Sequence, residues 1–285
     1  MSRLSAVIGL AVLALWVPGG AQFYATDTLR VVSYNIKHGR GNDNAVDLAR
    51  TAGVLRALTP DIVGLQEVDD LATRSGGVPE ARVLGQMLGL HDAFGRFMDF
   101  QGGAYGMAVL TRYPIVATQS VRLPDGNEPR VALSVEVQLP TGRRLTIVNV
   151  HFDWVRDDRF RFAQAEALAT YLDGLTMPYV LLGDFNDVPE SRTLALFKAR
   201  AKEAVKPAAD RFTFSSTEPE REIDFIFMAP AAAWRARDVR VITEPVASDH
   251  RPVVAVLELS SPDASSLWPW WRLEYPRCPA PFAPP

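Results

Sequence analysis

The segment that most limits the possible folds is Tyr179–Asp187, which reads YVLLGDFND. Four apolar residues in succession are typical of a strand that is buried on both faces. Gly183 permits a tight exit from this strand, and Asp184 and Asn186 alternate, so their side chains can point the same way. These groups suit hydroxyl activation and phosphate contact, although a simple turn built on Asp and Asn would have the same sequence.

Five further apolar runs lead to polar residues, which favours a site over a single turn. These polar positions are Asn35, Glu67, His151 with Asp153, Asp224, and Asp249 with His250. Helical periodicity predicts helices over 47–58, 80–90, 159–172 and 191–204, and Thr141-Gly142 predicts a hairpin. Strands that alternate with helices predict an α/β layered fold, and the hairpin makes its sheet partly antiparallel. Because strand ends of a layered sheet can meet at one edge, we expect the polar groups to form one site.

The composition is that of an ordinary soluble protein, with 48% hydrophobic and 22% charged residues in a chain of 285. This length allows one large α/β domain or two small ones. The net charge of −3 gives no general attraction to polyanions, so a nucleic-acid substrate would need a local basic face. Cys278 is the single cysteine, which excludes an intrachain disulfide, so the fold must depend on its core.

The two ends of the chain differ from its centre in composition. Residues 1–21 resemble a signal peptide, because Arg3 precedes an apolar run over 4–17 and small residues lead to Ala21. An uncleaved anchor is the alternative. Export without a disulfide predicts a periplasmic or secreted protein of a bacterial cell envelope. Residues 22–259 then form the folded domain, and the proline- and tryptophan-rich residues 260–285 form a tail, either packed or disordered.

The polar residues at the strand ends predict an oxygen-rich metal site. Glu67 is a hard-cation ligand, and carboxylates, carboxamides and two imidazoles accompany it. This set favours Mg²⁺, or Mn²⁺ in its place, over zinc. The sequence has no HExxH motif, no G-x-S-x-G nucleophile motif and no P-loop, which argues against a zinc peptidase, a serine hydrolase and a P-loop nucleotidase.

Five short motifs occur in the order and rough spacing of the endonuclease/exonuclease/phosphatase superfamily. They are Ser33-Tyr34-Asn35, Leu65-Gln66-Glu67, Asn149-Val150-His151, Gly183-Asp184-Phe185-Asn186 and Ser248-Asp249-His250. Residues 29–259 thus resemble a superfamily that includes deoxyribonuclease I, exonuclease III, neutral sphingomyelinases and inositol polyphosphate 5-phosphatases. The resemblance implies a four-layer α/β sandwich, with two mixed, mostly antiparallel β-sheets packed face to face and helices outside. It also implies Mg²⁺-dependent hydrolysis of a phosphate ester by in-line attack of water.

The resemblance also implies roles for the metal-binding and water-activating residues. Glu67 resembles the principal metal ligand, with Asn35 beside it. His250 resembles the group that accepts a proton from the attacking water or orients it, and Asp224 resembles the carboxylate that fixes its tautomer. Asp249 belongs to the closing motif and is also a candidate metal ligand.

The remaining candidates concern the attacking water and the substrate. Asp184 is the alternative water activator, and the resemblance does not decide between it and His250. His151 and Asn186 resemble donors to the phosphoryl oxygens. Arg74 and Arg130 are candidate phosphate clamps, since arginine binds phosphate bidentately, but each could instead pair with a surface carboxylate.

The sequence predicts a reaction class more sharply than a substrate, because one fold hosts many functions. We expect a nuclease-type phosphodiesterase, with a phospholipid headgroup, an inositol phosphate or a small organic phosphate as alternative substrates. No obligate protein partner is evident, and a monomer is expected. A catalytically silent binding protein is the alternative from another class. The candidate catalytic residues are all present, which argues against that alternative.

Overall fold

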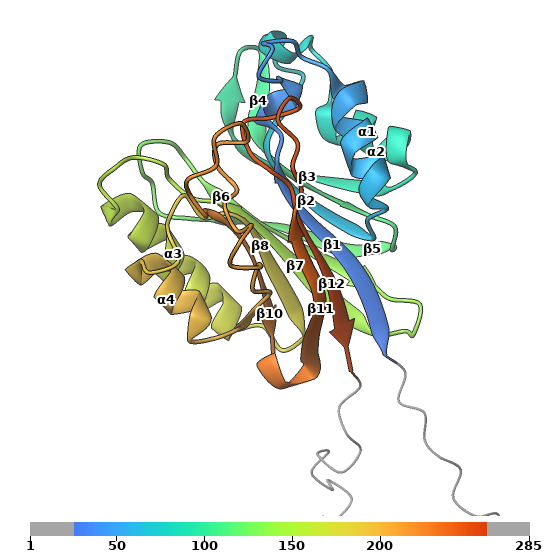
Figure 1. The fold of residues 1–285 in the computed structure, drawn as a ribbon, viewed down its shortest axis with the longest axis vertical. Helices are drawn as coiled ribbons and strands as arrows, with labels where there is room; N and C mark the ends of the chain where they lie inside the picture. The colour runs from blue at the N-terminus through green and yellow to red at the C-terminus, as the bar shows by residue number, and fades with distance from the viewer. Residues whose placement is uncertain (1–25, 261–285) are drawn as a thin grey trace, which may run out of the picture.

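The computed structural model describes residues 26–260, so the predicted signal peptide and the tail from residue 261 onward lie outside it. Two six-stranded sheets pack face to face, and two pairs of helices cover their outer faces (Figure 1). This arrangement confirms the predicted four-layer α/β sandwich. Within residues 26–260, no helix is long and apolar enough to cross a membrane.

Both sheets are mixed and mostly antiparallel. The first has the order β11-β12-β1-β2-β4-β3 and the second the order β5-β6-β7-β8-β10-β9. The first consists of β1 (Asp27–Asn35), β2 (Ile62–Asp70), β3 (His91–Phe100), β4 (Gly103–Thr111), β11 (Trp234–Val241) and β12 (Val253–Leu259). The second consists of β5 (Ile115–Arg122), β6 (Val131–Gln138), β7 (Arg144–His151), β8 (Tyr179–Asp184), β9 (Lys202–Glu203) and β10 (Asp224–Ala229). The pairs β1–β2 and β7–β8 are parallel, and in each pair a segment that contains a helix connects the two strands.

The helices are divided between the two outer faces (Figure 1). They are α1 (Leu48–Leu58), α2 (Glu80–Leu88), α3 (Arg159–Asp173) and α4 (Arg192–Lys198), with short 3₁₀ turns η1 (Lys37–Gly39), η2 (Thr73–Ser75) and η3 (Ala231–Ala233). Buried residues of α1 and α2 pack on the first sheet, and those of α3 and α4 pack on the second. A third apolar cluster fills the space between the sheets. The fold therefore has three apolar layers, which hold both sheets in fixed positions.

One predicted helix differs from the structure, and two strands of the structure were not predicted. The helix expected over 191–204 ends at Lys198, and residues Lys202–Glu203 form the short strand β9 instead. Strands β3 and β5 were not predicted, and both are edge strands with many exposed residues. An edge strand does not need the apolar alternation that identifies a strand in sequence.

A buried amide network joins the two sheets directly below the site. The Asn149 amide on β7 donates 2.9 Å hydrogen bonds to the carbonyls of Leu65 on β2 and Ala108 on β4. Its oxygen accepts a 2.7 Å bond from Gln66 Nε2. Gly64 lies at the same crossing, where an added Cβ would stand only 1.8 Å from Leu182 and 3.2 Å from Asn149. The sheets therefore approach closely at this point, and their ends keep a fixed relative position.

Candidate active site

The strand ends of both sheets meet at one cleft, as predicted from the sequence. The first sheet contributes Asn35 at the end of β1 and Glu67 within β2, while Asp249 and His250 precede β12. The second contributes His151, Asp184 and Asp224 at the ends of β7, β8 and β10. In the strand register Asp184 is paired with His151 on one side and with Asp224 on the other. The sheet therefore places these three side chains side by side.

The cleft has a volume of about 430 Å³. Acidic, basic and aromatic side chains line it together, namely Glu67, Arg74, Met98, Phe100, Tyr105, Glu128, Arg130, His151, Trp154, Asp184, Asn186, Phe214, Arg221, Ile223, Asp249 and His250. This size is typical of a pocket for a small organic molecule. Eight of the ten predicted site residues therefore line one cleft, and Asn35 and Asp224 do not.

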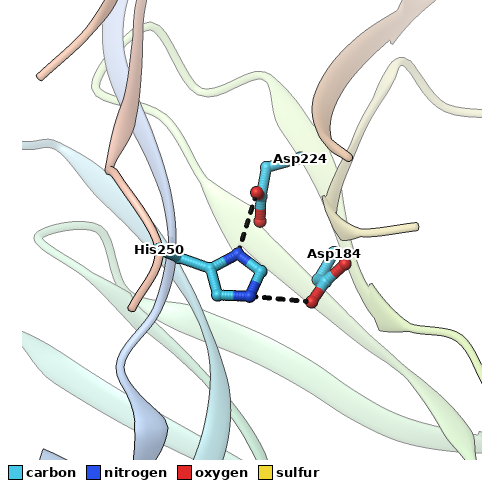
Figure 2. Close-up of side chains that lie close together, drawn as sticks. All are labelled: Asp184, Asp224 and His250. Carbon is cyan, nitrogen blue, oxygen red and sulfur yellow. Dashed lines mark hydrogen bonds and ion pairs between the residues drawn. The ribbon is translucent and has the colours of Figure 1, made fainter. Parts of the chain in front are cut away.

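His250 lies between two buried carboxylates (Figure 2). Its Nδ1 is 3.0 Å from Asp224 Oδ2, and its Nε2 is 3.6 Å from Asp184 Oδ2. A carboxylate can only accept, so Nδ1 carries a proton toward Asp224. This confirms the predicted contact between His250 and Asp224 and places Asp184 on the opposite ring nitrogen.

The three groups also perturb one another electrostatically. Burial raises the pKa of Asp184 to about 7, with Asp224 adding to the rise and His250 opposing it. Burial alone would lower the pKa of His250, but Asp224 and Asp184 raise it to about 10. The cluster therefore retains protons near neutral pH, and its protonation belongs to the interacting groups together.

Glu67 has an unusual backbone conformation and an uncompensated charge. Its φ of 56° lies in the left-handed region, at a β-bulge where the pairing of β2 with β4 shifts. Such strain in a non-glycine residue is found mainly at functional sites. The carboxylate accepts one bond of 3.1 Å from Asn35 Nδ2 and, among residues 26–260, has no basic partner within ion-pair distance. Burial raises the pKa of Glu67, so a bound cation would offset a real electrostatic cost.

Asn35 and Asp249 have partners that the sequence did not indicate. Asn35 Nδ2 also donates to Asp184 Oδ2 at 3.2 Å, while its oxygen accepts from the amide of Lys37. Asp249 pairs with Lys37 Nζ at 2.7 Å. As placed, Asn35 thus turns its nitrogen toward Glu67, and an amide flip is needed to present its oxygen to a metal. Lys37 Nζ therefore occupies the position beside Asp249 in which a metal cation would bind.

His151 faces the same carboxylate as His250 from the other sheet. Its Nε2 is 3.5 Å from Asp184 Oδ2, and its Nδ1 is 3.5 Å from Arg130 Nη1. Burial lowers the pKa of His151 well below its usual value, and the cationic Arg130 and His250 lower it further. His151 is therefore a neutral imidazole at neutral pH.

Asn186 is held in position by its own backbone and by β7. Its φ is 50°, and its amide N–H donates to Asp184 Oδ1 at 2.9 Å. Its side-chain Nδ2 donates to the carbonyl of Phe152 at 3.0 Å. One amide hydrogen remains for a ligand, since a carboxamide has two. The arrangement is compatible with the predicted contact between Asn186 and a phosphoryl oxygen.

The two arginines predicted to bind phosphate occupy different environments. Arg74 forms two 2.8 Å bonds with the buried Asp69, and its guanidinium stacks 4.4 Å from the ring centre of Phe100 and 5.1 Å from that of Tyr105. Its side chain is 27% exposed, so it still offers N–H groups to the cleft. Arg130 lines the cleft but is only 1% exposed, and its Nη1 is 3.5 Å from His151 Nδ1. Arg74 thus offers more surface to a ligand than Arg130, whose contact within the site is with His151.

Comparison with known proteins identifies the fold and the family. A model of the endonuclease/exonuclease/phosphatase family matches residues 32–250, well over half of the chain. The chain belongs to this family. Uncharacterized protein YbhP of Escherichia coli (strain K12) is 28% identical over 221 residues, which cover 75% of this chain and 87% of YbhP.

Solved structures agree with this membership. An endonuclease/exonuclease/phosphatase from Beutenbergia cavernae DSM 12333 has a TM-score of 0.67 at 26% identity, covering 81% of this chain and 72% of that one. The mannosyl-6-phosphatase Bt3783 of Bacteroides thetaiotaomicron VPI-5482 has a TM-score of 0.66 at 21% identity, covering 80% and 99%. Members of the family are phosphoesterases, and the deoxyribonuclease I-like fold predicted from the sequence is confirmed.

Several residues of this family member's cleft were missed by the sequence analysis. Trp154 lines the cleft and is 59% exposed. Phe214 lies 5.0 Å from the His250 ring, and Arg221 lines the same wall. For an aromatic residue in a loop, the sequence has no pattern that shows whether the side chain is packed or exposed. Lys37 was missed as well, because it begins the turn η1 after β1 has ended and no strand alternation marks it.

Proposed function

We propose that this protein is a divalent-metal-dependent phosphoesterase that hydrolyses its substrate by in-line attack of water. The observation that supports this best is the pairing of two features in one cleft. His250 is buried between Asp224 and Asp184, and Glu67 in the same cleft has no ion-pair partner among the described residues 26–260. A proton-accepting group beside an unpaired carboxylate is what metal-assisted hydrolysis requires.

Two groups of residues could hold the metal. Glu67, with Asn35 and Asp249, supplies oxygen donors of the kind that Mg²⁺ prefers, and Mn²⁺ could replace it. Asp184, Asp224 and His250 have ligand atoms that all lie within 4.8 Å of one another, so they form a second candidate. We favour the Glu67 group, because Asp224 is already paired with His250, whereas Glu67 has no ion-pair partner among residues 26–260. When bound, the cation would polarise the phosphoryl group and stabilise the developing negative charge.

The chain's own residues move the proton and position the phosphate. Asp184 Oδ2 lies within 3.6 Å of both histidine rings, and its pKa of about 7 suits Asp184 to accept the proton from water. His250, which is protonated at neutral pH, is placed to exchange a proton with Asp184. Asp224 holds the His250 ring in its orientation. His151 and Asn186 donate to the phosphoryl oxygens. No side chain in this scheme forms a bond to phosphorus.

The shape of the cleft favours a compact phosphate ester. A volume of about 430 Å³ holds one phosphate and a modest organic group, with Arg74 on one wall and Trp154 at the rim. A nuclease would need a longer basic track across the surface. A phosphodiester remains our first expectation, and the alternatives are a phospholipid headgroup and a monoester of a small alcohol. The likeness to a mannosyl-6-phosphatase at 21% identity concerns the fold alone.

We also propose that the protein is exported and acts as a monomer. The apolar run over residues 4–17, preceded by Arg3, supports export to the periplasm or the medium. Export is tested by fractionating cells that express the full chain and by sequencing the N-terminus of the recovered protein. An intact N-terminus in the cytosolic fraction would overturn it.

The activity is tested with bis-p-nitrophenyl phosphate and p-nitrophenyl phosphate, each with Mg²⁺, Mn²⁺ or EDTA. We expect cleavage of the diester that requires the metal and disappears in His250→Ala. His91→Ala is the matched control, because His91 is an exposed histidine outside the cleft. Cleavage of the monoester alone would move the proposal to a phosphatase. Full activity in EDTA would contradict it, and so would a stable phospho-enzyme.

A further inference from the structure

Arg130 is a buried cation whose position suggests a role other than phosphate binding. It directly precedes β6, and its side chain is 1% exposed. Nη2 pairs with Glu128 at 3.0 Å, Nη1 points to His151 Nδ1 at 3.5 Å, and the guanidinium lies 4.9 Å from the ring centre of Phe97. A group so enclosed has little surface for a substrate. Its nearest functional neighbour is the imidazole of His151.

The contact with Arg130 determines where the proton of His151 resides. A guanidinium has five N–H donors and no acceptor, and it stays protonated in proteins. His151 Nδ1 must therefore face Arg130 with its lone pair. Although 3.5 Å is long for a hydrogen bond, a second proton on Nδ1 would point directly at a cation. The single proton of the neutral ring then resides on Nε2, which faces Asp184 Oδ2 at 3.5 Å.

We propose that Arg130 is a positioning residue that fixes His151 as the neutral tautomer protonated on Nε2, so that this N–H, which faces Asp184, is the one donor that His151 can offer the reacting phosphate. The second half of this statement rests on the proposed function, whereas the tautomer does not. His250 has the opposite anchor, because Asp224 accepts from its Nδ1. The two imidazoles beside Asp184 thus differ at Nδ1, which faces a guanidinium in His151 and a carboxylate in His250.

The tautomer can be measured directly by NMR. The full chain contains four histidines, so ¹⁵N-histidine labelling with long-range ¹H–¹⁵N correlation resolves each ring, and His151→Gln assigns the signal of His151. We expect protonated Nε2 and unprotonated Nδ1 for His151, with and without Mg²⁺. A proton on Nδ1, or a doubly protonated ring at neutral pH, would overturn the proposal.

Variants of Arg130 separate positioning from simple structural support. Arg130→Met keeps the length of the side chain but removes the donors, so we expect His151 to lose its single tautomer. Arg130→Lys restores a cationic donor and should restore the Nε2–H form. Glu128→Gln is the control, because it removes the ion pair of Arg130 but leaves its contact with His151. An unchanged tautomer in Arg130→Met would overturn the role of Arg130 even if the wild type shows Nε2–H.

Kinetics test the second half of the proposal separately. Arg130→Met should lower kcat by about 10- to 100-fold, the usual effect of losing a partner that orients a site residue, with a much smaller change in KM. A rise in KM at constant kcat would instead make Arg130 a substrate clamp and overturn the proposal. If the wild type hydrolyses no phosphate ester but shows the predicted tautomer, the proposed function fails while the assignment of Arg130 to His151 stands.

Discussion

The two sheets each bring one histidine to the same oxygen of Asp184, and the two histidines have opposite partners. The loop before β12 on the first sheet supplies His250, whose Nδ1 faces the carboxylate of Asp224. Strand β7 of the second sheet supplies His151, whose Nδ1 faces the guanidinium of Arg130. The distances from Nε2 to Asp184 are nearly equal, at 3.6 and 3.5 Å. The two rings therefore differ in the charge of the group that faces Nδ1.

This difference assigns different chemistry to identical side chains. The carboxylates around His250 raise its pKa to about 10, so at neutral pH it holds a proton beside Asp184, whose own pKa is raised to about 7. Burial and Arg130 lower the pKa of His151, so it keeps one proton and does not titrate in that range. One imidazole is suited to proton transfer and the other to donation of a fixed hydrogen bond.

The largest effect is expected from removing the anchor of His250. Asp224→Asn preserves the shape of the side chain but offers Nδ1 a donor, and it should lower kcat by about 10²- to 10⁴-fold, the typical contribution of general acid–base catalysis. Steady-state hydrolysis of the preferred nitrophenyl ester measures this. Asp238→Asn, at an exposed position of β11, is the matched control. Activity within tenfold of the wild type would show that the dyad does not transfer the proton.

Metal binding distinguishes the two sheets in a second way. A cation at 100 times its Kd adds about 2.7 kcal/mol to the free energy of unfolding, which thermal denaturation detects. We expect Glu67→Gln on the first sheet to abolish the Mg²⁺-dependent rise in Tm. Asp224→Asn on the second should keep most of it. The reverse result would place the metal on the Asp184, Asp224 and His250 group instead.

The two histidines should also give the metal-free protein pH dependences of opposite sign. The pKa of His250 is raised in the folded state, so its contribution to stability is full below about pH 6.5 and is lost as the pH rises toward about 10. The pKa of His151 is lowered, so the folded state loses stability as the pH falls below 6.5. Each contribution has a limiting slope of about 1.4 kcal/mol per pH unit.

Urea unfolding in EDTA across this pH range measures these slopes. The free energy of unfolding of the wild type should exceed that of His250→Gln by an amount that grows as the pH falls from about 10 to 6.5. The corresponding difference between the wild type and His151→Gln should shrink as the pH falls below 6.5. Parallel pH curves for the two variants would show that the two rings sit in equivalent environments.

The smallest effect concerns Arg74, the arginine that faces the cleft. Arg74→Lys keeps the charge but loses the bidentate contact with Asp69, and it should raise KM by about tenfold, or about 1.4 kcal/mol, with little change in kcat. Arg130→Met, in contrast, should lower kcat, so the two arginines are expected to affect different kinetic parameters. Equal effects of both variants on KM would remove that distinction.

Most of the fold could be predicted from the sequence, because buried strands carry continuous apolar runs. Strand β8 and the hairpin at Gly142 were found in this way, and both are confirmed. The edge strands β3 and β5 were missed, since exposed edges need no such pattern. The helix over 191–204 was predicted too long, because the segment after Lys198 favours helix locally, yet Lys202–Glu203 pairs with β10.

The composition of the site was predictable, but its contacts were not. Polar residues such as Glu67 and Asp184 interrupt apolar runs, which marks them in the sequence. Their neighbours depend on strand register, which places Asp184 between His151 and Asp224. The burial of Arg130 depends on packing against Phe97 and His151, and no local pattern encodes it.

The central claim is that His250 transfers a proton whereas His151 donates a fixed hydrogen bond. Substitution of each histidine by glutamine tests this claim most directly. Glutamine retains an N–H donor but cannot exchange a proton near neutral pH. The decisive measurement is kcat for His151→Gln and His250→Gln side by side, with Mg²⁺ and the same substrate. We predict that His151→Gln retains at least about ten times the activity of His250→Gln, because general acid–base catalysis contributes about 10²- to 10⁴-fold and loss of one hydrogen-bond donor costs less. Equal losses, or a greater loss in His151→Gln, would contradict the account.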